Sequence, residues 1–157
     1  MKIVSAKDIE KLPHLYQVSF AIFCARQVVH LLIDEKVKSA AMRSIEAAEG
    51  FVAGKVSREE CQTAAAAAHA AAYAAAAHAA AYAAAAAAHA AAAAHAAAHA
   101  AAYAAYAVTD AAAAYAVTDA YAVTDAYAEK KALVEAQWAY YNELLSFNET
   151  FEKVVLG

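Results

Sequence analysis

Hydrophobic and polar positions recur with a helical period in the first third of the chain. Residues 14–33 are apolar on nearly all sides, and only Ser19, Arg26 and His30 share a polar stripe. This is the pattern of a helix surrounded by neighbours. Over residues 34–53 apolar positions recur at spacings of four, four, three and four: Val37, Ala41, Ile45, Ala48 and Val52. We therefore expect a central helix followed by an amphipathic one.

Residue types that begin and end helices mark the boundaries. Ser5 with Asp8 and Ser57 with Glu60 have capping-box spacing, which predicts a short helix over residues 6–12 and another helix after residue 57. Pro13 ends the short helix or begins the next one. Gly54 is typical of a helix C-terminus.

The C-terminal part predicts an amphipathic helix over about residues 127–145. Its apolar face consists of Val134, Trp138, Tyr141 and Leu145. A further capping pattern at residues 146–149 predicts that this helix stops there and that a final short turn follows.

Residues 64–107 contain only alanine, histidine and tyrosine. Alanine is the best helix former, so we expect helices that pack through methyl groups. A single helix of this length would be ~66 Å long, whereas a compact domain of this size has a radius of gyration near ~15 Å. We therefore expect the run to fold back. The sequence predicts an all-α fold, a compact bundle or short superhelix of about six to eight closely packed Ala-rich helices.

The motif Tyr-Ala-Val-Thr-Asp-Ala begins at residues 106, 115 and 121. Because Thr and Asp are N-cap residues, a chain turn is expected at 109–110 or 118–119. Tyrosine is enriched at interfaces and aspartate complements basic targets. The candidate partner-binding residues are Tyr115, Asp119, Tyr121, Asp125 and Tyr127, although each tyrosine also suits a gap between alanines.

Length and charge limit the possible organisation and partners. We expect one helical domain over residues 1–157, with mixed composition in 1–62, Ala/His/Tyr-rich helices in 63–127 and C-terminal helices in 128–157. The net charge of −4, without a basic cluster, does not favour nucleic acid. The uncharged run exceeds the ~20 residues of a membrane span, but it has no Leu, Ile, Phe or Val and carries five histidines, so no membrane partner is expected.

The first residues lack the apolar stretch of a secretory leader, and Cys24 and Cys61 are expected as reduced thiols, so we expect a cytoplasmic protein. His95 and His99 have the i, i+4 spacing of a metal chelate, but no acid or cysteine is close in sequence, so they are weak metal candidates. Cys24 and His30 do not form a catalytic dyad, because side chains six residues apart on a helix point in different directions. No catalytic residue, cofactor or enzyme activity is expected.

Four stretches carry a resemblance to a known family. They are Phe20-Ala-Ile-Phe-Cys-Ala-Arg26, Arg43-Ser-Ile-Glu-Ala-Ala48, Phe51-Val-Ala-Gly-Lys55 and the Ala-rich segment around His69. Together they resemble the alanine-rich putative immunity proteins of bacterial polymorphic toxin systems, over roughly residues 18–75 and more loosely to about 127. The resemblance implies an all-helical, non-enzymatic cytoplasmic protein that binds and neutralises a cognate toxin. Arg43 and Glu46 would pair with each other, or with Arg26 and His30.

The residue patterns and the family resemblance together lead to three candidate functions, of which toxin neutralisation is what the resemblance implies. The first is a protein-binding domain that neutralises a toxin by covering part of its surface. The second is a structural Ala-rich protein that associates with itself as a homo-oligomer. The third is a histidine-rich metal-binding protein.

Overall fold

The computed structural model describes residues 2–32, 34–75, 87–88, 91–92, 104 and 123–156. Within these ranges the elements are α1 (Ala6–Ile9), α2 (His14–Val28), a 3-10 turn η1 (Val29–Leu31), α3 (Glu35–Val52), α4 (Arg58–Ala75) and α7 (Val123–Leu156). The described part contains helices and no strand, which confirms the all-α class. The expected number of six to eight helices is not confirmed, because the described part contains five α-helices.

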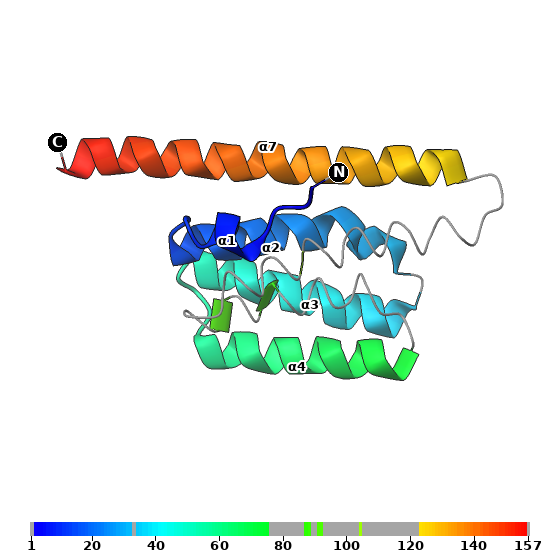
Figure 1. Ribbon diagram of the computed structural model, residues 1–157. Helices are drawn as coiled ribbons and strands as arrows, with labels where there is room; N and C mark the ends of the chain where they lie inside the picture. The colour runs from blue at the N-terminus through cyan, green and yellow to red at the C-terminus, as the bar shows by residue number, and fades with distance from the viewer. Residues whose placement is uncertain are drawn as a thin grey trace.

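Figure 1 shows α7, α2, α3 and α4 stacked in that order, with α1 beside α2 and α7. The helix that was expected to be central does pack on two sides, against α3 and α7. Its side chains Val18, Phe20 and Cys24 have no exposed surface. The amphipathic face predicted for residues 34–53 is also confirmed, since Val37, Ala41, Ile45 and Ala48 are buried.

Alanine methyl groups form part of the same core. Ala65, Ala87, Ala88, Ala91 and Ala104 all have no exposed surface and belong to one cluster with Phe20 and Ile45. Small side chains let helix backbones approach closely, so dispersion contacts run along the interface. Residues as far apart in the sequence as Ala65 and Ala104 are both core residues, so these described alanines of the run belong to one packed core.

Three of the helix starts carry capping hydrogen bonds, and two of them lie at the predicted Ser5 and Ser57. The Ser5 amide and hydroxyl donate to the Asp8 carboxylate at 3.1 and 2.6 Å. The Asp34 carboxylate accepts from the backbone amides of Lys36 and Val37. Glu60 and Ser57 form the reciprocal capping box before α4. The first helix is shorter than expected, because α1 ends at Ile9 and not at residue 12.

The turn between α3 and α4 depends on two glycines. Gly54 has φ +69°, a left-handed conformation that favours glycine. The chain then returns so that the backbone amides of Lys55 and Val56 both donate to the Gly50 carbonyl, at 2.7 and 3.2 Å. The Val56 side chain occupies the space that a Cβ on Gly50 would need. Gly54 therefore provides the left-handed backbone of the turn. The missing side chain of Gly50 leaves room for Val56 to pack against α3.

The predicted helix end near residue 145 is wrong. The single helix α7 runs through Ser146 to Leu156, and the Thr150 hydroxyl donates to the Ser146 carbonyl one turn earlier in this helix. Residues 123–156 contain neither glycine nor proline, so nothing in the backbone ends the helix at the Ser146 pattern. A helix of 34 residues is about 51 Å long and projects past the bundle.

The predicted apolar face of this helix is confirmed, since Val134 and Tyr141 are buried and Trp138 and Leu145 pack partly buried against the core. Within the part of the chain that the structure describes, no helix is both long and apolar enough to cross a membrane.

Candidate functional site

The residues that the sequence singled out for binding lie mostly outside the described part. This holds for Tyr115, Asp119 and Tyr121, for His95 and His99, and for the expected chain turns at 109–110 and 118–119. Asp125 and Tyr127 lie in the first turns of α7. The partner-binding role of the tyrosines and aspartates and the metal-binding role of the two histidines stay predictions. Among the described residues, no group of three or more His, Cys, Asp or Glu side chains is placed to hold a metal ion.

A charge pair with two short contacts joins α2 to α3. Arg26 donates from Nε to Glu49 Oε1 at 2.7 Å and from Nη2 to Glu49 Oε2 at 2.8 Å. Such a two-point contact matches the planar guanidinium to the carboxylate. The hydrogen bonds that Arg26 donates to Glu49, and then the negative charge of Glu49, raise the pKa of Arg26. The side chains remain 45% and 38% exposed, so both can still meet a partner.

Arg43 and Glu46 were expected to pair with each other, or with Arg26 and His30. Arg26 instead bonds directly to Glu49, and Glu46 acts on Arg26 through its charge. Glu49 is the partner of Arg26, because it lies on the α3 face that meets α2. Arg43 lies on another side of α3, where it lines two depressions of about 500 and 440 Å³ between α3 and α4. No ion pair of Arg43 with another described residue is present within 4.0 Å.

A depression of about 340 Å³ opens beside this pair, between α2, α3 and α7. We call it the aromatic groove. Its lining residues are Ser19, Ile22, Phe23, Arg26, Glu49, Val52 and Tyr140. Phe23 and Tyr140 stack with ring centroids 4.4 Å apart and planes 19° apart, and so join α2 to α7. The groove combines an apolar floor with one charge pair at its edge.

Two exposed apolar side chains extend the surface of the groove. Leu15 lies on the α2 face of Ser19 and Ile22, and it is 46% exposed. Phe147 lies two turns beyond Tyr140 on α7, and it is 57% exposed. Because α2 and α7 run in opposite directions, both residues belong to the same end of the helix pair (Figure 1). An apolar surface of this kind is typical of a protein interaction site.

Tyr140, which lines the aromatic groove, is partly buried. Desolvation raises the pKa of Tyr140, and the nearby charge of Glu143 raises it further. Tyr140 therefore stays a neutral phenol at physiological pH. It presents an apolar ring together with a hydroxyl group, the combination that makes tyrosine common in interfaces.

The two cysteines do not have the properties of nucleophiles. Both are free and buried. Burial raises the pKa of Cys24 far above its ordinary value, and burial followed by the charge of Glu60 raises that of Cys61. The Cys61 thiol also donates to the Ala47 carbonyl at 3.4 Å. Since only the thiolate reacts, these side chains serve packing.

Sequence reasoning missed the aromatic groove. The sequence placed Ser19, Arg26 and His30 on a polar stripe and indicated that the apolar residues around it pack against neighbouring helices. Leu15 and Ile22 share the face of Ser19 and Arg26 at spacings of four and three. Apolar residues that alternate with polar ones on an exposed helix face could have predicted a binding surface from the sequence.

A family model described as Imm-5 like putative immunity protein matches residues 7–141, a range that includes all residues lining the aromatic groove. No curated protein and no solved structure matches the chain.

Proposed function

Because the chain belongs to the Imm-5 like putative immunity protein family, we propose that it is a non-enzymatic protein that binds and neutralises a cognate bacterial toxin in the cytoplasm. It acts by stoichiometric contact, covering part of the toxin's surface. The raised pKa values of its thiols agree with a protein that performs no covalent chemistry.

The observation that supports a binding role best is the aromatic groove with its exposed apolar extension. Affinity in protein complexes is concentrated in a few aromatic and arginine side chains that become buried. Tyr140, Phe23 and Arg26 are of these types and meet at one depression. Leu15 and Phe147 would lose most of their water contact when a partner covers them. We propose that this surface contacts the toxin.

Co-expression tests this proposal directly. The toxin domain encoded beside the gene would be expressed in bacteria with the wild-type protein, and growth and co-purification would be measured. We expect the wild type to restore growth and to form a complex of fixed stoichiometry. Leu15→Asp and Phe147→Asp should weaken both, because each places a charge in an apolar contact.

A matched control separates loss of contact from loss of folding. Ala66→Asp adds the same charge at an exposed position of α4, away from the groove. It should rescue growth as the wild type does, and thermal melts should show all three variants folded. Rescue by Leu15→Asp and Phe147→Asp at wild-type level would exclude the groove as the contact surface, and failure of the wild type to bind the neighbouring toxin would contradict the proposed function.

Size-exclusion chromatography with light scattering addresses the self-association hypothesis. A mass of 16.3 kDa for the isolated chain identifies a monomer that is free to bind a toxin. A stable homodimer that Phe147→Asp dissociates would instead mean that the groove joins two copies of this chain.

A further inference from the structure

The charged groups around the aromatic groove are mostly acidic. Arg26 is its one lining cation, and Glu49 neutralises it by direct contact. Glu46 lies close enough to raise the pKa of Arg26 further through its charge, and Glu143 acts in the same way on Tyr140. Arg26 carries one positive charge, and three glutamates carry one negative charge each: Glu46, Glu49 and Glu143. The net charge of these four side chains is therefore −2.

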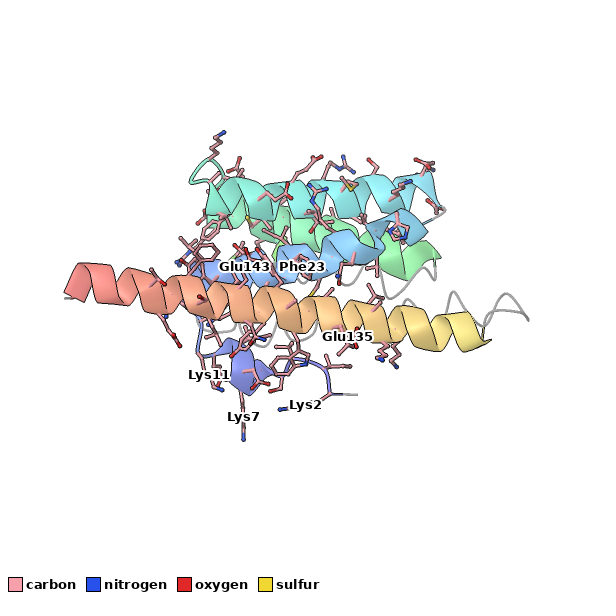
Figure 2. The ribbon with its side chains drawn as sticks, turned by 90° about the horizontal axis from the view of Figure 1, so that it is seen from above. Lys2, Lys7, Lys11, Phe23, Glu135 and Glu143 are labelled. Atoms are coloured by element: carbon pink, nitrogen blue, oxygen red, sulfur yellow. The ribbon has the colours of Figure 1, made fainter. Side chains whose placement is uncertain are left out.

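The nearby lysines do not neutralise this edge. Figure 2 shows Lys2, Lys7 and Lys11 on one side of α7, whereas Phe23 and Glu143 lie on its other side. Lys2 and Lys11 are directed toward Asp8, at 3.9 and 3.7 Å. Helix α7 therefore separates a basic flank at the N-terminal segment from an acidic groove at α2 and α3.

From this arrangement we infer that the partner segment seated in the aromatic groove presents an apolar side chain flanked by lysine or arginine. The inference rests on the proposed function and states the chemistry of the partner's contact. The apolar side chain covers Ile22, Phe23 and Val52. The flanking cations face the carboxylates of Glu46 and Glu143, which are both exposed.

An acidic segment would fit this surface poorly. The Arg26 guanidinium already gives two N–H donors to Glu49, so a carboxylate of the partner would have to compete with Glu49. It would also face the like charges of Glu46 and Glu143. Like charges brought together at an interface oppose binding, whereas complementary charges favour association and fix its orientation.

A peptide selection tests the inference without the toxin. A randomised library displayed on a small helical scaffold would be selected on the immobilised full-length protein, and the recovered pool would be sequenced. We expect segments with an aromatic or aliphatic residue flanked by Lys or Arg to be enriched. Recovery of acidic segments, or a pool without basic bias, would overturn the inference.

Charge variants on one helix locate the effect. Glu143→Gln should weaken the selected peptides about two- to fivefold, the usual effect of one exposed ion pair. Glu143→Lys should weaken them more. Glu135→Lys makes the same change farther along α7 (Figure 2), where Glu135 pairs with Lys131, and it should leave binding unchanged. Equal effects of Glu143→Lys and Glu135→Lys would overturn the assignment to the groove, because they would reflect net charge alone.

The two proposals fail in different ways. If basic peptides bind the groove but the neighbouring toxin is not neutralised, the proposed function fails and the surface chemistry stands. If the toxin is neutralised but the selection returns acidic peptides, the proposed function stands and this inference is wrong.

Discussion

The indole N–H of Trp138 donates a hydrogen bond to the backbone carbonyl of Lys2 at 2.7 Å, across 136 positions of the chain. One turn of α7 therefore holds the N-terminal segment. Tyr141 adds a second contact, because its hydroxyl donates to the Asp8 carbonyl at 2.8 Å. The Tyr141 ring also meets Phe20 of α2 edge to face, with centroids 6.5 Å apart. The same residues thus join α7 to both the N-terminal segment and the core.

Two adjacent tyrosines allow this contact to be measured. Tyr141→Phe removes the donor to the Asp8 carbonyl and should lower the free energy of unfolding by about 1 kcal/mol in urea titrations. Tyr140→Phe also removes one hydroxyl, but that hydroxyl has no hydrogen-bond partner among the described residues, so its effect should be close to zero. Equal effects of the two substitutions would contradict a specific role for the Tyr141 hydroxyl.

The capping box at Ser5 should make stability depend on pH. Hydrogen bonds from Ser5 hold the pKa of Asp8 below its ordinary value of 3.8. A carboxyl group whose pKa is lowered by folding stabilises the protein above that ordinary value and loses the contribution as pH falls below it. Ser5→Ala should therefore be less stable than the wild type at pH 7, and urea midpoints of the two should converge toward pH 2.

Ser39→Ala is the control for this pH dependence, because Ser39 is exposed on α3 and its hydroxyl makes no hydrogen bond to another described residue. Its difference from the wild type should be small and should not change with pH. A Ser5→Ala difference that stays constant from pH 7 to pH 2 would show that the Asp8 carboxylate is not involved.

The two glycines of the α3–α4 turn should respond differently to alanine. Gly→Ala inside a helix normally stabilises by about 0.5–1 kcal/mol. At Gly50 the added Cβ would meet the Val56 side chain, so we expect a loss of about 1–3 kcal/mol instead. Shortening Val56 to alanine removes the Cγ2 atom that overlaps the added Cβ, but leaves the residue-56 Cβ 3.2 Å away, a tight contact. In a Val56→Ala background the same Gly50→Ala substitution should therefore cost clearly less than it does beside Val56.

Gly54→Ala serves as the comparison. A Cβ on Gly54 meets nothing within 4 Å, so its cost is only that of the left-handed backbone, about 1–2 kcal/mol. That cost should be the same with Val or Ala at position 56. Urea unfolding of the single and double variants measures the cost of each glycine substitution with either residue at position 56. A Gly50→Ala effect that does not change with residue 56 would exclude the steric explanation.

The sequence predicted local features well and long-range ones poorly. The capping residues Ser5 and Ser57, the turn at Gly54 and the buried face from Val37 to Ala48 depend on neighbours a few positions away, and the structure confirms them. The helix end predicted at Ser146 was wrong, because capping residues allow a helix to begin but do not force the preceding helix to end. The helix-forming sequence continues without interruption through Ser146. The pairing of Arg26 with Glu49 depends on which faces of α2 and α3 meet, which local periodicity does not specify.

The aromatic groove could not be derived for a related reason. Its walls come from α2, α3 and α7, and the sequence separation between Phe23 and Tyr140 is more than a hundred residues. Hydrophobic periodicity identifies an apolar face but does not say whether a neighbouring helix covers all of it. Leu15 and Phe147 were expected in the interior or at a helix end, and they are exposed because no described helix extends over that end of the α2–α7 pair.

The methyl-lined contact between α3 and α4 gives the most direct test of how this fold is held together. Ala65 of α4 has no exposed surface, whereas its neighbour Ala66 is exposed. Leucine in place of Ala65 should force the two helices apart and lower the free energy of unfolding by about 1–3 kcal/mol. The same substitution at Ala66 should stay within about 0.5 kcal/mol of the wild type, because surface changes away from the core have small effects. Both variants change helix propensity equally, so the difference between their urea midpoints measures packing alone. If Ala65→Leu were as stable as Ala66→Leu, the alanine face of α4 would not be in close contact with α3, and dispersion between methyl groups would not be what holds this part of the bundle together.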